Sequence, residues 1–90
     1  MNFTTEMIAD IFAASADSVT LINRDANYAA YITRTASGET EDFWKAMIER
    51  NVVHLETIKA YKGVDNTTSV WTSEDFTDID AAIIKGKTLY

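Results

Sequence analysis

The fold class of this chain depends on residues 19–35, whose sequence is VTLINRDANYAAYITRT. Residues 19–23 hold β-branched and aliphatic side chains over a short length, which is typical of a strand. Residues 24–27 are polar and suit a turn, where Asn27 would tolerate a left-handed backbone. Residues 28–35 would then return as a second strand, because the β-branched residues near their end resist helix formation. This interpretation predicts a β-hairpin.

A helical interpretation of residues 28–35 stays open. Three apolar side chains lie at helical spacing, the two alanines favour a helix, and Asp25 could provide the cap. We favour the hairpin, so the predicted fold class is α+β: a helix, a β-hairpin, a long helix and a final helix in one domain, residues 1–90. The alternative is an all-α four-helix bundle.

A first helix is predicted before the hairpin, over residues 5–16. Thr4 stands where an N-cap side chain accepts hydrogen bonds from the first turn. Phe3 and Ile8 are spaced as a hydrophobic staple around that cap. The apolar stripe of this helix consists of Met7, Ile8, Ile11 and Phe12.

A long helix is predicted over about residues 40–61. Glu41 and Lys45 form an i, i+4 pair on it, and Gly63 fits the C′ position that follows a helix. Asn51 interrupts the stripe, and it would either bond a neighbouring segment and fix the packing or lie at the edge in water. The apolar stripe consists of Trp44, Met47, Ile48, Val52, Leu55 and Ile58.

A last helix is predicted to begin at residue 72 or 73, since Thr72-Ser73-Glu74-Asp75 approximates a capping box. Trp71 and Phe76 are spaced as a staple around that cap. Gly86 fits the C′ position that closes the helix. The apolar stripe consists of Phe76, Ile79, Ala82 and Ile83.

The charge balance argues against a protein that binds nucleic-acid backbones. The chain has 14 acidic and 8 basic residues, a net charge of −6, and its bases are scattered, whereas phosphate binders cluster their lysines and arginines. Because there is no cysteine, no disulfide or thiolate metal site can form. No segment approaches the roughly 18 apolar residues of a membrane span, and the first residues lack the basic start of a signal peptide. We expect neither a nucleic acid nor a membrane as direct partner.

No catalytic or metal-binding pattern is evident. His54 is the only histidine, and no carboxylate lies at i±3 or i±4 to orient it. The acids gather at two predicted helix starts, around Glu41 and around Asp75, where each carboxylate stabilises a helix by about 0.3–1 kcal/mol. Nucleotide-binding and hydrolase motifs are missing. We therefore predict a non-enzymatic protein with no cofactor and no bound metal.

Aromatic side chains are the main candidates for contact with a partner, because such residues are enriched at interface centres. The acids at the start of the last helix could add a charged component. For Trp71, a purely structural role as a staple of its own helix is an equal alternative. The predicted interaction residues are Phe43, Trp44, Trp71, Tyr90, Glu74, Asp75 and Asp78.

Three segments give the chain a resemblance to small uncharacterised proteins of tailed bacteriophages: Phe43-Trp44-Lys45-Ala46-Met47, Arg50-Asn51-Val52-Val53-His54-Leu55 and Trp71-Thr72-Ser73-Glu74-Asp75. The predicted helix–hairpin–helix order of the first two thirds is also similar to that of the small head–tail joining proteins of such phages. The resemblance implies a structural role and a location in the virion or the host cytoplasm.

Two functions are therefore expected. The first is a non-enzymatic structural or protein–protein interaction protein, which binds a protein partner or further copies of itself through an apolar patch. The alternative is a small acidic inhibitor, an anti-defence protein or nucleic-acid mimic, which blocks a basic groove on its partner. The alternative requires contiguous carboxylates on one face and predicts salt-sensitive binding.

Overall fold

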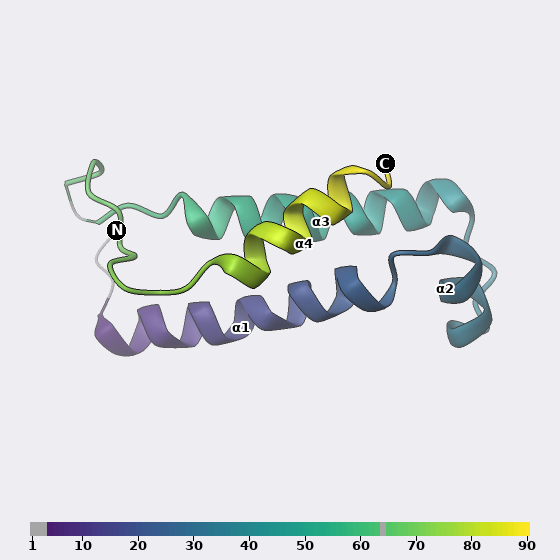
Figure 1. Cartoon of the computed structure of the whole chain (residues 1–90), viewed down its shortest axis with the longest axis horizontal. Coiled ribbons are helices and arrows are strands. Elements are labelled where there is room, and N and C mark those ends of the chain that lie inside the picture. The colour runs from purple at the N-terminus through teal and green to yellow at the C-terminus, as the bar shows by residue number, and fades with distance from the viewer. Residues whose placement is uncertain (1–3, 64) are drawn as a thin grey trace.

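The computed structural model describes residues 4–63 and 65–90, which form four α-helices (Figure 1). The only β geometry among these residues is an isolated antiparallel bridge between Lys62 and Ser69. The predicted α+β class is therefore wrong, and the all-α alternative fits. The helix–hairpin–helix order of the joining proteins is likewise not found in the described residues. The helices are α1 (Thr5–Arg24), α2 (Tyr28–Thr35), α3 (Glu41–Lys59) and α4 (Thr77–Lys87).

The predicted first strand, residues 19–23, is in fact the last part of α1. Ile22 is fully buried and continues the inward-facing side on which Ser15 and Ser18 also lie. Helix propensity disfavours an ordinary residue by at most about 0.7 kcal/mol, whereas burial of an isoleucine contributes about 1.5–3 kcal/mol. Packing therefore outweighs the strand propensity of this segment.

The predicted second strand is α2, and its cap explains why. The backbone of Asn27 is extended, with φ of −135°, and its side-chain oxygen accepts the N–H of Ala30 at 3.0 Å. Asn27 is therefore the N-cap, so both its predicted left-handed conformation and the capping role given to Asp25 are wrong. The left-handed residue is Ala36, with φ of 51°, and α2 ends there.

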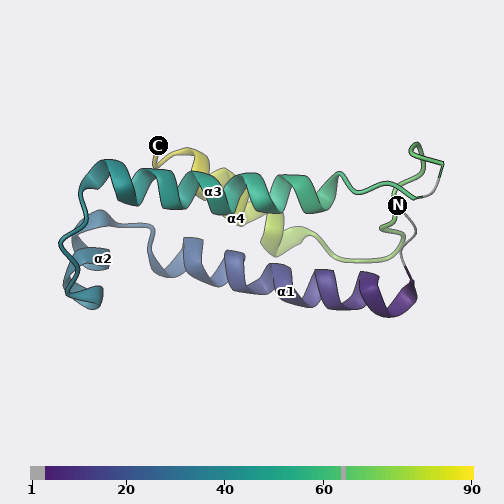
Figure 2. The same cartoon turned by 180° about the vertical axis from the view of Figure 1, so that it is seen from behind.

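The helices are arranged in two layers. α1 and α3 run antiparallel and side by side along the 45 Å length of the molecule, and α2 lies beyond the end of α1 (Figure 1). α4 packs across both long helices on one side. Seen from behind, α1 and α3 lie in front of α4, and none of the described helices covers them (Figure 2).

The core is built where these three helices meet. Gly86 is buried inside α4 and allows that helix to approach α3 closely, because a Cβ at this position would lie 2.3 Å from Cγ2 of Val52. The prediction of Gly86 as a C′ residue is wrong, since α4 continues to Lys87. The buried side chains of the core cluster are Ile22, Tyr31, Trp44, Ile48, Val52, Leu55, Ile79, Ala82 and Ile83.

Both long helices begin as predicted. The Thr4 hydroxyl accepts the N–H of Met7 at 3.1 Å and caps α1, whereas the predicted staple between Phe3 and Ile8 lies outside the described residues because Phe3 is not described. α3 begins after Thr40, whose hydroxyl accepts an N–H of the first turn. The predicted pair of Glu41 and Lys45 is confirmed at 3.5 Å.

The predicted end of α3 needs correction. The helix stops at Lys59, and Gly63 lies in the turn beyond it, where its N–H donates to the carbonyl of Thr68 at 2.8 Å. Gly63 is therefore not a C′ residue.

The predicted start of α4 also needs correction. The capping box does not form, because Glu74 accepts the N–H groups of Thr72 and Ser73 before the helix begins. Asp75 accepts the N–H of Thr77, the first residue of α4.

Candidate functional site

Two of the four aromatic interaction candidates are part of the core. Trp44 and Trp71 are buried, and their indole N–H groups donate to the backbone carbonyls of Asp25 at 2.8 Å and of Ile58 at 2.7 Å. The ring of Trp71 also packs edge-on against Phe76, with centroids 5.8 Å apart, which agrees with its predicted role beside the last helix. Only Phe43 and Tyr90 present exposed aromatic surface.

The acidic candidates lie beside a groove of about 260 Å³ between α1 and the start of α4. Asp75 and Asp78 line the groove and are exposed, and neither forms an ion pair with any described lysine or arginine. Hydrogen bonds from Thr77 hold the pKa of Asp75 below its usual value, so this carboxyl group stays ionised. The remaining lining residues are uncharged: Phe12, Ser15, Ala16, Val19, Thr20 and Ile79.

Glu74 lies directly before Asp75 and is half-buried. Its pKa is also lowered, chiefly by the backbone N–H of Ser73. The N-terminus of a helix carries only about half a positive charge. The carboxylates of Glu74, Asp75 and Asp78 therefore exceed what the dipole of α4 can balance, and this end of the molecule is acidic.

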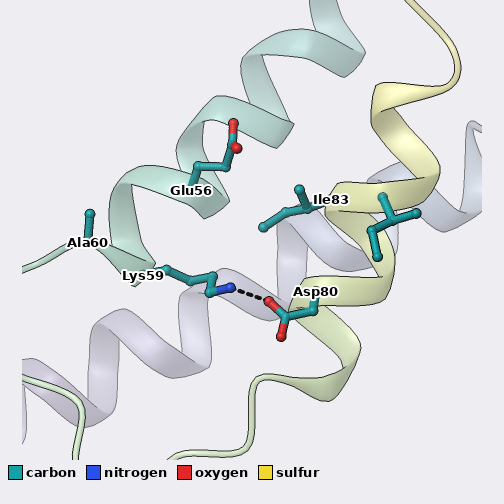
Figure 3. Close-up of a pocket in the computed structure, with 6 residues that line it drawn as sticks. Glu56, Lys59, Ala60, Asp80 and Ile83 are labelled. Atoms are coloured by element: carbon teal, nitrogen blue, oxygen red, sulfur yellow. Dashed lines mark hydrogen bonds and ion pairs between the residues drawn. The ribbon is translucent and has the colours of Figure 1, made fainter.

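A second groove, of about 540 Å³, lies between α3 and α4 (Figure 3). Its charged residues are paired across the groove: Lys59 contacts Asp80, as Figure 3 shows, and Glu56 lies 2.8 Å from Lys87. Ile84 lines the groove and is 69% exposed, the largest exposed fraction of the large hydrophobic side chains described. The groove is electrically balanced and partly apolar.

The face of α1 that lies away from α4 is the third candidate surface. α1 meets α4 through Phe12, whose ring lies edge-on to Phe76 with centroids 5.8 Å apart. A helix turns by about 100° per residue, so Met7 and Leu21 lie on the other flank of α1. Met7 is 41% exposed, whereas Leu21 is half-buried and packs against the core cluster.

α3 presents a matching flank. It meets α4 through Val52 and Glu56, since Val52 faces Gly86 and Glu56 pairs with Lys87. Phe43 and Met47 lie on the opposite side of the helix. Phe43 is 47% exposed and Met47 is half-buried. We call Met7, Leu21, Phe43 and Met47 the uncovered face: Met7 and Phe43 are exposed, while Leu21 and Met47 pack against the edge of the core. Figure 2 shows no helix over this side of α1 and α3.

His54 and Asn51, the other two polar residues considered, both lie on α3. His54 is exposed on α3. Asn51 donates its side-chain N–H to the carbonyl of Met47 at 2.8 Å, so it bonds its own helix, which neither of the predicted alternatives included.

Among the described residues, no group of three His, Asp or Glu side chains is placed to hold a metal ion. In the same residues, no helix combines the length and the apolar character that a membrane crossing requires.

Asp25 is a buried charged residue whose role the sequence did not indicate. Its carboxylate accepts hydrogen bonds from Arg24 at 3.2 Å and from Arg34 at 2.5 Å. Its backbone carbonyl accepts the indole N–H of Trp44. The residue therefore holds the end of α1, α2 and α3 together, which is a structural role.

The comparisons with protein families, characterised proteins and solved structures give no match to this chain. The surfaces of the molecule are therefore the only indication of its function.

Proposed function

We propose that this chain is a non-enzymatic structural protein that acts by binding protein, as a component of the kind found in phage particles. The observation that carries the proposal is the uncovered face, where Met7 on α1 and Phe43 on α3 are exposed and no described helix crosses this side of the two helices (Figure 2). Exposed apolar side chains that flank one uncovered side are suited to contact with another protein. The phage setting comes from the resemblance of the sequence alone.

The interaction proposal is supported by where the apolar side chains are placed. A chain of 90 residues has a small core, so a large hydrophobic side chain left outside that core adds little to the stability of the isolated chain. Met7 and Phe43 are nevertheless both more than two-fifths exposed, on the same side of the molecule. Contact with protein would bury them.

The first test is the mass of the purified chain in solution, measured by light scattering at low and at high salt. An oligomer that persists at high salt supports the proposal, because contacts made by apolar surface are not screened by ions. A chain that is monomeric at every salt concentration, up to the highest protein concentration reached, would count against it.

A second candidate function is favoured by the unpaired carboxylates of Asp75 and Asp78. They border the apolar groove between α1 and α4, which suits a basic, amphipathic segment of a partner protein. In this case the chain would be an acidic inhibitor that occupies a basic surface.

A lysine-rich amphipathic peptide tests this second function by titration calorimetry. Binding should weaken steeply between low and high salt, and it should be lost in an Asp75→Asn/Asp78→Asn variant. Asp42→Asn is the matched control, because Asp42 is an exposed acid at the start of α3. Equal effects of the two changes would exclude the groove as the binding site.

A further inference from the structure

We propose that the uncovered face binds a second copy of this chain, with α1 of each copy against α3 of the other. The inference rests on the proposed function and names the partner of the same surface. The two copies would form a four-helix bundle from α1, α3 and their counterparts, with α4 of each copy on the outside. The bundle would cover Phe43 and Met7 near its two ends and the outer surfaces of Leu21 and Met47 between them.

The charges that border the uncovered face favour a second copy over other partners. Glu6, Asp10 and Asp17 follow one another on the outer edge of α1, at intervals of four and seven residues, which is one and two helical turns. The corresponding outer edge of α3 carries Arg50, seven residues after Phe43, and then His54. One edge of the face is therefore acidic, and the other edge carries a cation.

A two-fold axis that runs along the helices brings unlike edges together. It places the acidic edge of α1 opposite the edge of α3 that carries Arg50, and it does so twice because the contact is self-complementary. A copy with a net charge of −6 would repel a second copy through most other faces. The pattern of charges therefore selects this pairing.

The positions of the charged residues along the helix axes also fit this pairing. The hydrogen bond between Trp44 and Asp25 fixes these two residues at one level. Because α1 and α3 run antiparallel with the same rise per residue, Arg50 is level with about residue 19 of α1 and His54 with about residue 15. Asp17 of one copy therefore lies between Arg50 and His54 of the other.

Both charged groups are available for this contact. Asp17 and Arg50 are exposed, and neither forms an ion pair with another described residue. The molecule measures 45 × 20 × 19 Å. A stable protein contact buries about 800 Å² on each partner, which is comparable with one long side of a molecule of that size.

Light scattering on paired variants tests which side of the molecule carries the contact. The wild-type chain should have twice the mass of the 10.1 kDa monomer. Phe43→Lys, and independently Met7→Lys, should weaken the dimer at least about tenfold, because each copy would lose a buried apolar side chain and gain a charge. Ile84→Lys is the matched control, since Ile84 is the most exposed large hydrophobic side chain described and lies in the groove beside α4.

The outcomes separate this inference from the proposed function. A dimer that survives both Phe43→Lys and Met7→Lys but dissociates with Ile84→Lys would overturn the inference and leave the proposed function standing. A wild-type chain that stays monomeric at every concentration would count against both. Circular dichroism of each variant tests whether it remains helical, and only helical variants are compared with the wild-type chain.

A charge exchange tests the pairing of α1 with α3. Asp17→Arg and Arg50→Asp should each weaken the dimer, because each places like charges opposite one another. The double variant Asp17→Arg/Arg50→Asp should restore the affinity to within about threefold of wild type. If the loss of dimer affinity in the double variant equals the sum of the losses in the two single variants, then these residues do not face one another and the proposed arrangement is wrong.

Discussion

The guanidinium of Arg34 in α2 lies 2.5 Å from the carboxylate of Asp25, which is buried directly after the end of α1. Arg24 approaches the same carboxylate at 3.2 Å. Among the described residues, the pair of Arg34 and Asp25 is the only ion pair that α2 forms with the rest of the chain. A buried carboxylate therefore helps to hold α2 in place, together with the ring of Tyr31 in the core.

Replacement of Asp25 by asparagine should lower the free energy of unfolding by about 1.5–3 kcal/mol. The amide keeps the size of the side chain but removes the charge that both arginines bond. The loss stays in this range because Arg24 and Arg34 are partly exposed and regain water. Urea denaturation measures the change. Glu49→Gln, an exposed change on α3, serves as control and should stay within about 0.5 kcal/mol.

Gly86→Ala should destabilise the chain although alanine is the better helix former. The added Cβ would meet Cγ2 of Val52 at 2.3 Å, so α4 must move away from α3. Such overpacking costs about 1–3 kcal/mol, and the gain in helix propensity offsets about 1 kcal/mol of it. We therefore expect a net loss of up to about 2 kcal/mol in thermal or urea unfolding.

Two further variants show whether the close approach is the cause. Gly38→Ala meets no atom within 4 Å and should leave the stability unchanged or slightly raised. In a Val52→Ala background the cost of Gly86→Ala should shrink, because the clashing methyl group is gone. The same cost in both backgrounds would mean that the contact with Val52 does not limit α4.

The turn after α3 should lose its order in acid. The hydroxyl of Thr68, and then the N–H groups of Thr68 and Thr67, hold the pKa of Asp65 well below its usual value of about 3.9. A depressed pKa means that the stabilisation is fully present above pH 4 and is lost as the pH falls through the folded value. The amide chemical shifts of Thr67 and Thr68 should therefore titrate together below pH 4, and an Asp65→Asn variant should show no such titration.

The starts of the two long helices could be predicted because their caps are local, whereas the predicted caps of α2 and α4 are wrong. Thr4 accepts a hydrogen bond from the first turn of α1, and Trp71 packs on Phe76, as their spacing indicates. Residues 19–35 were predicted wrongly because Ile22 is held in a helix by burial against distant segments, which a local pattern does not contain. The close approach of Gly86 to Val52 likewise depends on a distant segment, so the local pattern around Gly86 wrongly predicts a helix end.

The candidate surfaces could be predicted only in part. The acids at the start of α4 were identified, and they do border a groove. The uncovered face could not be predicted, because which flank of α1 and α3 remains open depends on where α4 packs. Trp44 and Trp71 were assigned to a contact by residue type, but each finds a buried carbonyl for its indole N–H.

Trp44→Phe should lower the free energy of unfolding by about 1–3 kcal/mol, because it leaves the buried carbonyl of Asp25 without the donor it now has. The remaining ring still fills most of the space, so the chain should fold and stay helical by circular dichroism. Tyr90→Phe, a change at an exposed aromatic residue, should alter the stability by less than about 0.5 kcal/mol. If Trp44→Phe is also neutral, then packing of the ring and not its hydrogen bond joins α3 to the end of α1.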